Sequence, residues 1–170
     1  MGFVDKEIIN PEALFGISVL LSFIAFGIVT ALYIWPRLKS MRREDALTAL
    51  AVPHTFRFVG LSFLVPGVVS PSLPPAFAAP AAYGDLGAAL LAIAAIGALA
   101  ARARFALLVV WALNIWGSVD LLAAIYQGQG PPGALGAAFY IPTVIVPPLL
   151  VTHALMFWLL LRPPLGPSSK

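Results

Sequence analysis

The sequence predicts an all-α integral membrane protein built as a bundle of five transmembrane helices. Of its 170 residues, 61% are hydrophobic and only 10% are charged, and the mean hydropathy is +0.96. Ordinary globular domains carry about 25% charged residues. Because a soluble domain must cover its surface with polar side chains, this composition excludes soluble enzymes, nucleic-acid binders and disordered proteins.

Five long apolar stretches justify the number of helices, and the chain length predicts a single transmembrane domain over residues 1–170. Each stretch holds 18 to 24 residues, against roughly 20 needed to cross the hydrocarbon core of a bilayer. Helices are expected because lipid cannot satisfy the open edge of a strand. The expected spans are residues 12–35, 47–70, 84–101, 105–127 and 139–161.

The first span has clear end signals. Asn10 is a good N-cap, Pro11 suits the first helical position, and Glu12 in the first turn complements the helix dipole. Pro36 is expected to stop this helix. The connection from Pro36 to Asp45 that follows is rich in basic residues.

Prolines predict that the second and fifth spans are kinked, because each removes a backbone donor and clashes with the preceding turn. The freed carbonyls point either to a broken helix that lines a ligand or ion site, or to a bend that only shapes the bundle. The prolines in question are Pro53, Pro66, Pro142, Pro147 and Pro148.

The third span is nearly all alanine and leucine, which predicts a central helix that its neighbours approach closely. A homodimer interface on this helix is an alternative. Before it, residues 71–83 are expected to form a Pro/Ala loop, and after it residues 101–104 a tight turn. Residues 128–138 are expected to form an uncharged loop before the fifth span.

Charge placement predicts the orientation of the bundle. The 36–45 connection, the 102–104 turn and the C-terminal tail hold 8 of the 10 lysines and arginines, whereas the opposite side holds only Lys6. The positive-inside rule then puts the N-terminus outside and the C-terminus in the cytoplasm, which means the inner membrane in a bacterium. Interfacial aromatic residues agree, with Tyr83, Tyr126 and Tyr140 at outer ends and Trp35 and Trp158 at inner ends.

Five polar residues are expected inside the membrane, where burial is costly and a functional role is the default interpretation. Counting along the helices places most of them near the middle of the bilayer. These residues are His54, Arg57, Asn114, Asp120 and His153.

Arg57 and Asp120 are expected to pair, because Asp120 is the only carboxylate that the expected spans place well inside the membrane. In a competing register the second helix starts at Pro53, and residues 44–52 form a short interfacial helix. Arg57 would then lie one turn from the cytoplasm and extend its side chain to the surface.

No motif identifies an activity, so the sequence favours a protein that is not an enzyme. The leading hypothesis is that the five polar residues bind, and in one version transport, a small or lipid-like ligand. No cofactor or metal is predicted, and the absence of cysteine excludes thiolate metal sites.

Three other functions stay open. His54 and His153 could be the axial ligands of haem b, since they lie on different helices at similar depth. The chain could be an accessory subunit of a larger membrane complex, its polar residues serving only to pack helices. Asp120 and His153 could transfer protons in an intramembrane isomerase, provided that both face one cavity.

Overall fold

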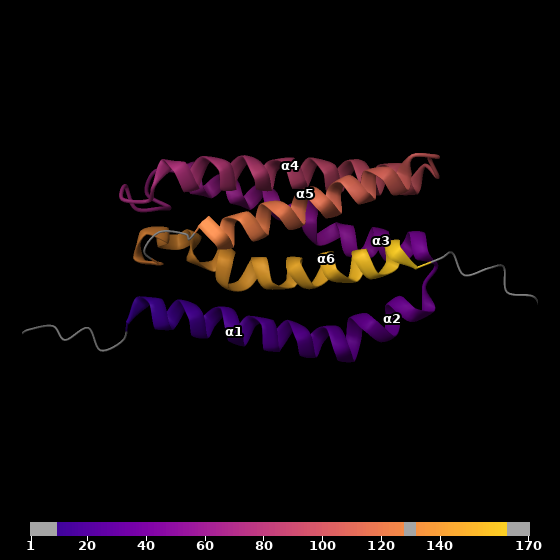
Figure 1. The fold of residues 1–170 in the computed structure, drawn as a ribbon, viewed down its shortest axis with the longest axis horizontal. Coiled ribbons are helices and arrows are strands. Elements are labelled where there is room, and N and C mark those ends of the chain that lie inside the picture. Colours follow the sequence, from indigo (N-terminus) through magenta and orange to yellow (C-terminus); the bar gives the residue numbers. More distant parts are fainter. Residues whose placement is uncertain (1–9, 128–131, 163–170) are drawn as a thin grey trace, which may run out of the picture.

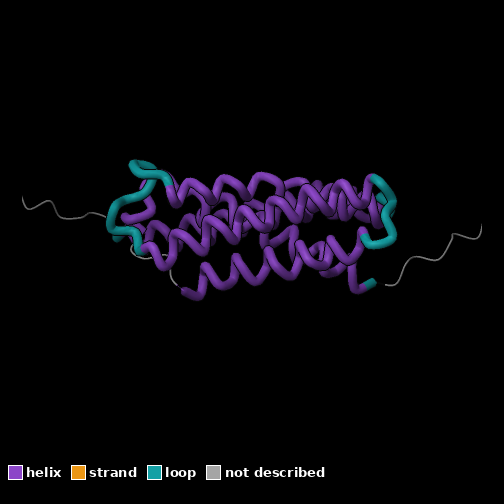
Figure 2. The backbone as a smooth tube through the Cα atoms, turned by 90° about the horizontal axis from the view of Figure 1, so that it is seen from above, coloured by secondary structure: helices purple, strands orange, loops and turns teal. Residues whose placement is uncertain are grey.

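The computed structural model describes residues 10–127 and 132–162, and this part of the chain is almost entirely helical, with no strand. Lys6, Lys170 and residues 128–131, the start of the expected 128–138 loop, lie outside the described residues. The helices run side by side along one long axis, with the connections at the two ends (Figure 1, Figure 2). Five are long and apolar enough to cross a membrane: Pro11–Ser40, Arg43–Leu64, Pro75–Ala100, Ala106–Tyr126 and Ile141–Leu161.

The first span consists of α1 (Pro11–Val29), a π-helix (Thr30–Ile34) and α2 (Trp35–Ser40). Its start is as predicted: the side chain of Asn10 accepts a hydrogen bond of 2.9 Å from the backbone N–H of Glu12. No residue of α1 is fully buried: many of its apolar side chains are exposed, as expected for contact with lipid, while Phe15 packs against Phe139 of the bundle.

Pro36 does not end the first span, so this prediction was wrong. Immediately before it, the N–H of Trp35 bonds to the carbonyl of Thr30, one residue further back than in an α-helix. Such a π-turn widens the helix at the point where a proline ring would meet the preceding turn. The fifth span has the same arrangement. A π-helix (Ile141–Ile145) comes first, and Pro147 follows in the first turn of α6 (Val146–Leu161).

The second span begins with α3 (Arg43–Ala51) and continues as a 3-10 helix, η2 (Val52–Leu64). It starts four residues earlier and ends six residues earlier than the predicted 47–70. The helix type changes one residue before Pro53, and Pro66 lies beyond the end of the span. The register that starts a new helix at Pro53 is therefore not the one adopted.

The third span, α4, covers Pro75–Ala100 and begins nine residues before the predicted Gly84. The Pro/Ala run was wrongly predicted to be loop as far as residue 83. Pro75 occupies the first turn of α4, where its missing N–H would be unpaired anyway, and the alanines that follow are strong helix formers. Asp85 consequently lies about three turns inside the helix rather than at its start.

The predicted turn at 101–104 joins α4 to α5 (Ala106–Gln127), and a second 3-10 helix, η3 (Pro132–Phe139), precedes the fifth span. α4 is the most buried of the five spans, as the central packing helix should be. One end of the bundle carries the described residues of the basic connections (Figure 1). There the rings of Trp35 and Trp158 pack 4.6 Å apart, with Lys39 and Arg162 over their faces.

Two separate clusters of buried apolar side chains stabilise the bundle. One lies at the basic end and includes Leu47, Ala92, Leu113 and Met156. The other lies at the opposite end and includes Leu135 with residues of η2 and of the first turns of α4. Each long helix of the core contributes to both clusters, and its polar residues come between them.

Ala92→Leu should lower the stability of the bundle, because Ala92 is fully buried in the first cluster. Overpacking a close-packed interior costs about 1–3 kcal/mol. Thermal unfolding in detergent measures the change. Ala94→Leu, at an exposed position of the same helix, is the matched control, and equal unfolding temperatures for the two variants would contradict this packing.

Candidate functional site

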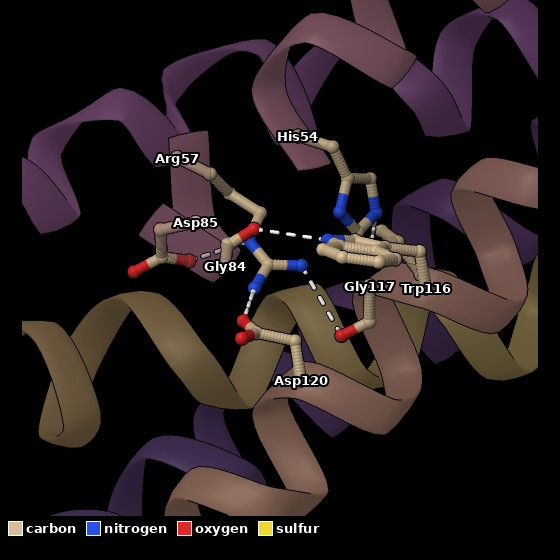
Figure 3. A network of polar contacts seen from close by, with 8 residues as sticks. His54, Arg57, Gly84, Asp85, Trp116, Gly117 and Asp120 are labelled. Carbon is tan, nitrogen blue, oxygen red and sulfur yellow. Dashed lines mark hydrogen bonds and ion pairs between the residues drawn. The ribbon is translucent and has the colours of Figure 1, made fainter. Parts of the chain in front are cut away.

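A layer of polar side chains separates the two apolar clusters and is built on four helical segments. η2 contributes His54 and Arg57, α4 contributes Asp85, α5 contributes Asn114 and Asp120, and α6 contributes His153. Figure 3 shows the guanidinium of Arg57 at the centre of this layer, between Asp85, Asp120 and Gly117.

Arg57 is buried, and each of its three guanidinium nitrogens contacts a different partner. Its Nε lies 2.7 Å from Oδ1 of Asp85, and its Nη2 lies 2.5 Å from Oδ2 of Asp120. Its Nη1 donates to the backbone carbonyl of Gly117 at 3.2 Å. The side chain has no exposed surface, so Arg57 points into the bundle and does not extend to its surface.

Asp85 is the residue that the sequence interpretation missed. The Arg57–Asp120 pair was expected, but Asp85 had been placed at the outer end of a helix by the mistaken loop over residues 71–83. With α4 starting at Pro75, Asp85 is buried beside Arg57. The signal that could have found it is a lone carboxylate in a run of alanine, glycine and leucine, because such a run continues a helix better than a loop.

Three glycines make room for the charged groups. A Cβ at Gly60 would collide with the carboxylate of Asp85, and one at Gly84 would collide with that of Asp120. A Cβ at Gly117 would lie 2.6 Å from Nε2 of His153 and 2.8 Å from Nη1 of Arg57. Each glycine lies on a different helical segment, so the site requires close backbone approach on three sides.

The two histidines pack against each other beside this cluster, with ring centroids 4.1 Å apart. Nε2 of His54 lies 3.0 Å from the hydroxyl of Thr152, which itself donates to the carbonyls of Pro148 and Leu149. His54 must therefore donate through Nε2, which leaves Nδ1 as a bare acceptor.

His153 is held in the same way by the neighbouring helix. Its Nδ1 lies 2.7 Å from Oδ1 of Asn114. An amide oxygen only accepts, so His153 donates through Nδ1 and presents an unprotonated Nε2 toward Gly117. Within the described residues, neither bare nitrogen has a hydrogen-bond partner. All five polar residues expected from the sequence thus lie in one layer, with Asp85 and Thr152 added to them.

The histidine pair does not fit a bis-histidine haem. Axial ligation needs the two imidazoles to point their nitrogens at one iron from opposite faces of a macrocycle. Here the rings pack directly on each other, and one nitrogen of each is engaged by Thr152 or Asn114. The packed rings leave no room between them for a porphyrin.

Small cavities border the carboxylates. One of about 20 Å³ is lined by Asp85 and Asp120 together with apolar residues of η2, α4, α5 and the fifth span. Another of about 10 Å³ is lined by Arg57 and Asp85. A water molecule needs roughly 10–15 Å³. His153 lines neither cavity, so the arrangement that an Asp120–His153 isomerase requires is absent from both.

Gly84→Ala should destabilise the protein by about 1–3 kcal/mol, because the added methyl displaces the carboxylate of Asp120 from Arg57. Gly97→Ala in the same helix meets no atom within 4 Å, and it should be neutral or stabilise by up to about 1 kcal/mol through helix propensity. Thermal unfolding of both variants in detergent checks the contrast. Equal effects of the two changes would show that Gly84 does not serve to seat Asp120.

Arg57→Met should destabilise the fold by about 3–5 kcal/mol, because it leaves two buried carboxylates without their cation. Adding Asp85→Asn and Asp120→Asn to Arg57→Met removes those charges and should recover most of the loss. Chemical or thermal unfolding of the single and triple variants measures this. A triple variant no more stable than Arg57→Met would contradict the role of Arg57 as the counter-ion of Asp85 and Asp120.

Comparison with known proteins assigns a family to the chain. No curated protein and no solved structure matches it. A family model described as a domain of unknown function, DUF8737, matches residues 14–161. This match covers all five membrane spans from the second turn of α1 to the last residue of α6. The chain therefore belongs to the DUF8737 family.

Proposed function

We propose that this membrane protein binds and transfers a proton at the cluster of Arg57, Asp85 and Asp120. The observation that carries the proposal is a charge imbalance: two carboxylates contact one guanidinium in the interior of a membrane-spanning bundle. If both are ionised the cluster keeps one uncompensated negative charge, which is costly in a medium of low polarity. One bound proton makes the cluster neutral.

The oxygens of the two carboxylates favour this chemistry. Each carboxylate uses one oxygen to contact Arg57 (Figure 3), and its second oxygen lies against a glycine, with no hydrogen-bond donor among the described residues. The second oxygen can take up a proton to form a carboxylic acid and release it again, while the first keeps Arg57 in place. The cavity between Asp85 and Asp120 has room for one water, which is a suitable carrier between them.

The size of the ligand follows from the same cavities. The small ligand expected from the sequence is, in this proposal, a proton moving through single waters. A lipid-like ligand at this site would need far more space than about 20 Å³. Asp120 is the more exposed of the two carboxylates, at 17% of its side chain against 10% for Asp85, and we assign it the exchange with the surroundings of the site.

We infer that the basic end of the bundle faces the cytoplasm. The described basic residues outside the polar layer lie at that end, and lysine and arginine gather on the cytoplasmic side of membrane proteins. With five spans the N-terminal end of α1 is then outside, and the membrane would be the inner membrane in a bacterium. The polar layer lies between the two apolar clusters, where a proton crossing the bundle would need a carrier.

Proton flux into vesicles tests the proposal. The purified protein is placed in liposomes that contain a pH-sensitive dye, and a pH step is applied in each direction with potassium and valinomycin to balance charge. Wild type should dissipate the gradient faster than protein-free vesicles. Asp120→Asn and Asp85→Asn should fall to the rate of the protein-free vesicles, because an amide cannot exchange a proton in this way.

Glu12→Gln is the control, because Glu12 is an exposed carboxylate in the first turn of α1 and far along the chain from the cluster. It should match wild type. A wild-type rate equal to that of empty vesicles would overturn proton transfer and leave the cluster as a structural lock. So would flux that survives both aspartate substitutions in protein that remains folded.

A further inference from the structure

A cleft of about 750 Å³ opens at the basic end of the bundle, away from the polar layer. One wall is the start of α3, with Arg42, Glu44 and Asp45. The other wall is the turn between α4 and α5, with Arg102 and Arg104. No step of the proposed proton transfer uses this cleft.

Opposite charges line the cleft without neutralising each other across it. Among the described residues, the one ion pair of the cleft joins Arg42 to Glu44 on the same wall, at 3.9 Å and largely exposed. Arg102 and Arg104 lie beyond ion-pairing distance of any carboxylate in the described ranges. The cleft therefore has Arg102 and Arg104 on one side and two carboxylates on the other, where Arg42 offsets Glu44 and Asp45 has no ion-pair partner among the described residues.

Arg102 adopts a backbone conformation that a side chain disfavours. Its φ is 52°, at the position that follows the end of α4, where Ala103 N–H bonds to Ala98 O and Arg102 N–H bonds to Leu99 O, both at 3.0 Å. Glycine is the usual residue at this point of such a helix ending. An arginine is thus held at the cleft against the preference of the backbone.

Apart from Thr48, whose hydroxyl donates to the carbonyl of Glu44, the remaining lining of the cleft is apolar. Leu99, Ala106 and Leu107 lie along the side of α4 and α5, with small alanines beside them. A cleft with charged walls at the end of a bundle and apolar walls along its side suits a lipid. The headgroup contacts the charged walls, and the acyl chains contact the apolar walls.

We propose that this cleft binds the headgroup of a zwitterionic aminophospholipid. The phosphate diester lies against Arg102 and Arg104, whose planar guanidinium groups suit phosphate oxygens. The primary ammonium lies against Glu44 and Asp45 and donates hydrogen bonds to them. A trimethylated ammonium cannot donate such bonds, and a headgroup without a cation would face the two carboxylates unfavourably.

Mass spectrometry of the intact protein released from detergent micelles tests this binding. The probes are phosphatidylethanolamine, phosphatidylcholine and phosphatidylglycerol, each titrated separately, and glycerophosphoethanolamine, which carries the first headgroup without acyl chains. Phosphatidylethanolamine should bind more tightly than the other two lipids. Glycerophosphoethanolamine should compete only at much higher concentration; competition at equal concentration would overturn the lipid assignment in favour of a soluble zwitterion.

Variants of the two walls should give different results. Arg102→Gly and Arg104→Gln should each weaken binding of phosphatidylethanolamine and of phosphatidylglycerol by about fivefold. Glu44→Gln combined with Asp45→Asn should weaken phosphatidylethanolamine alone and strengthen phosphatidylglycerol. Arg102→Gly also separates binding from folding, because glycine suits the backbone at this position and the variant should unfold no earlier than wild type.

Two results would overturn the proposal. One is a wild-type protein that prefers phosphatidylglycerol, which would indicate only the general attraction of a basic membrane end for anionic lipid. The other is unchanged binding of phosphatidylethanolamine by folded Arg102→Gly and Arg104→Gln proteins.

Discussion

The contact of one arginine with two aspartates is the constraint on which the rest of the bundle depends. A guanidinium without exposed surface must be matched by anions, because the interior of a membrane does not solvate a charge as bulk water does. Arg57 therefore fixes how η2, α4 and α5 lie relative to one another, because each supplies one of the three charges. The glycines at 60, 84 and 117 follow from the same constraint, since only close backbone approach lets the charges meet.

The polar layer also explains why the apolar interior is divided in two. Each cluster is formed by alanine, leucine and a few larger side chains from the same long helices, above and below the charged residues. A continuous apolar core would pack as well without any ion pair, and buried ion pairs are in general no more stabilising than well-packed apolar residues. Because a layer of charged residues is no better than apolar packing at stabilising the bundle, its presence is in line with the proton chemistry proposed above.

The prolines of the first and fifth spans are accommodated by a shared device. In both spans a π-helical turn ends two residues before a proline, and the helix then continues in α form. The widened turn takes up the ring and the missing donor without ending the span. Pro75 of α4 needs no such device, because it occupies the first turn of the helix, whereas Pro80 lies inside the same helix.

Composition and hydrophobic runs were sufficient to predict an all-α membrane protein with five spans, because the demand that lipid makes on a chain is local to each helix. The same reasoning found His54, Arg57, Asn114, Asp120 and His153, since an intramembrane polar residue stands out in any apolar run. It placed Asp85 at a helix end, because local signals do not distinguish a Pro/Ala loop from a helix that begins with proline. That Arg57 has a second anion, and that three glycines seat the charged groups, depended on how the helices pack: the contact between Arg57 and Asp85 leaves no trace in local periodicity.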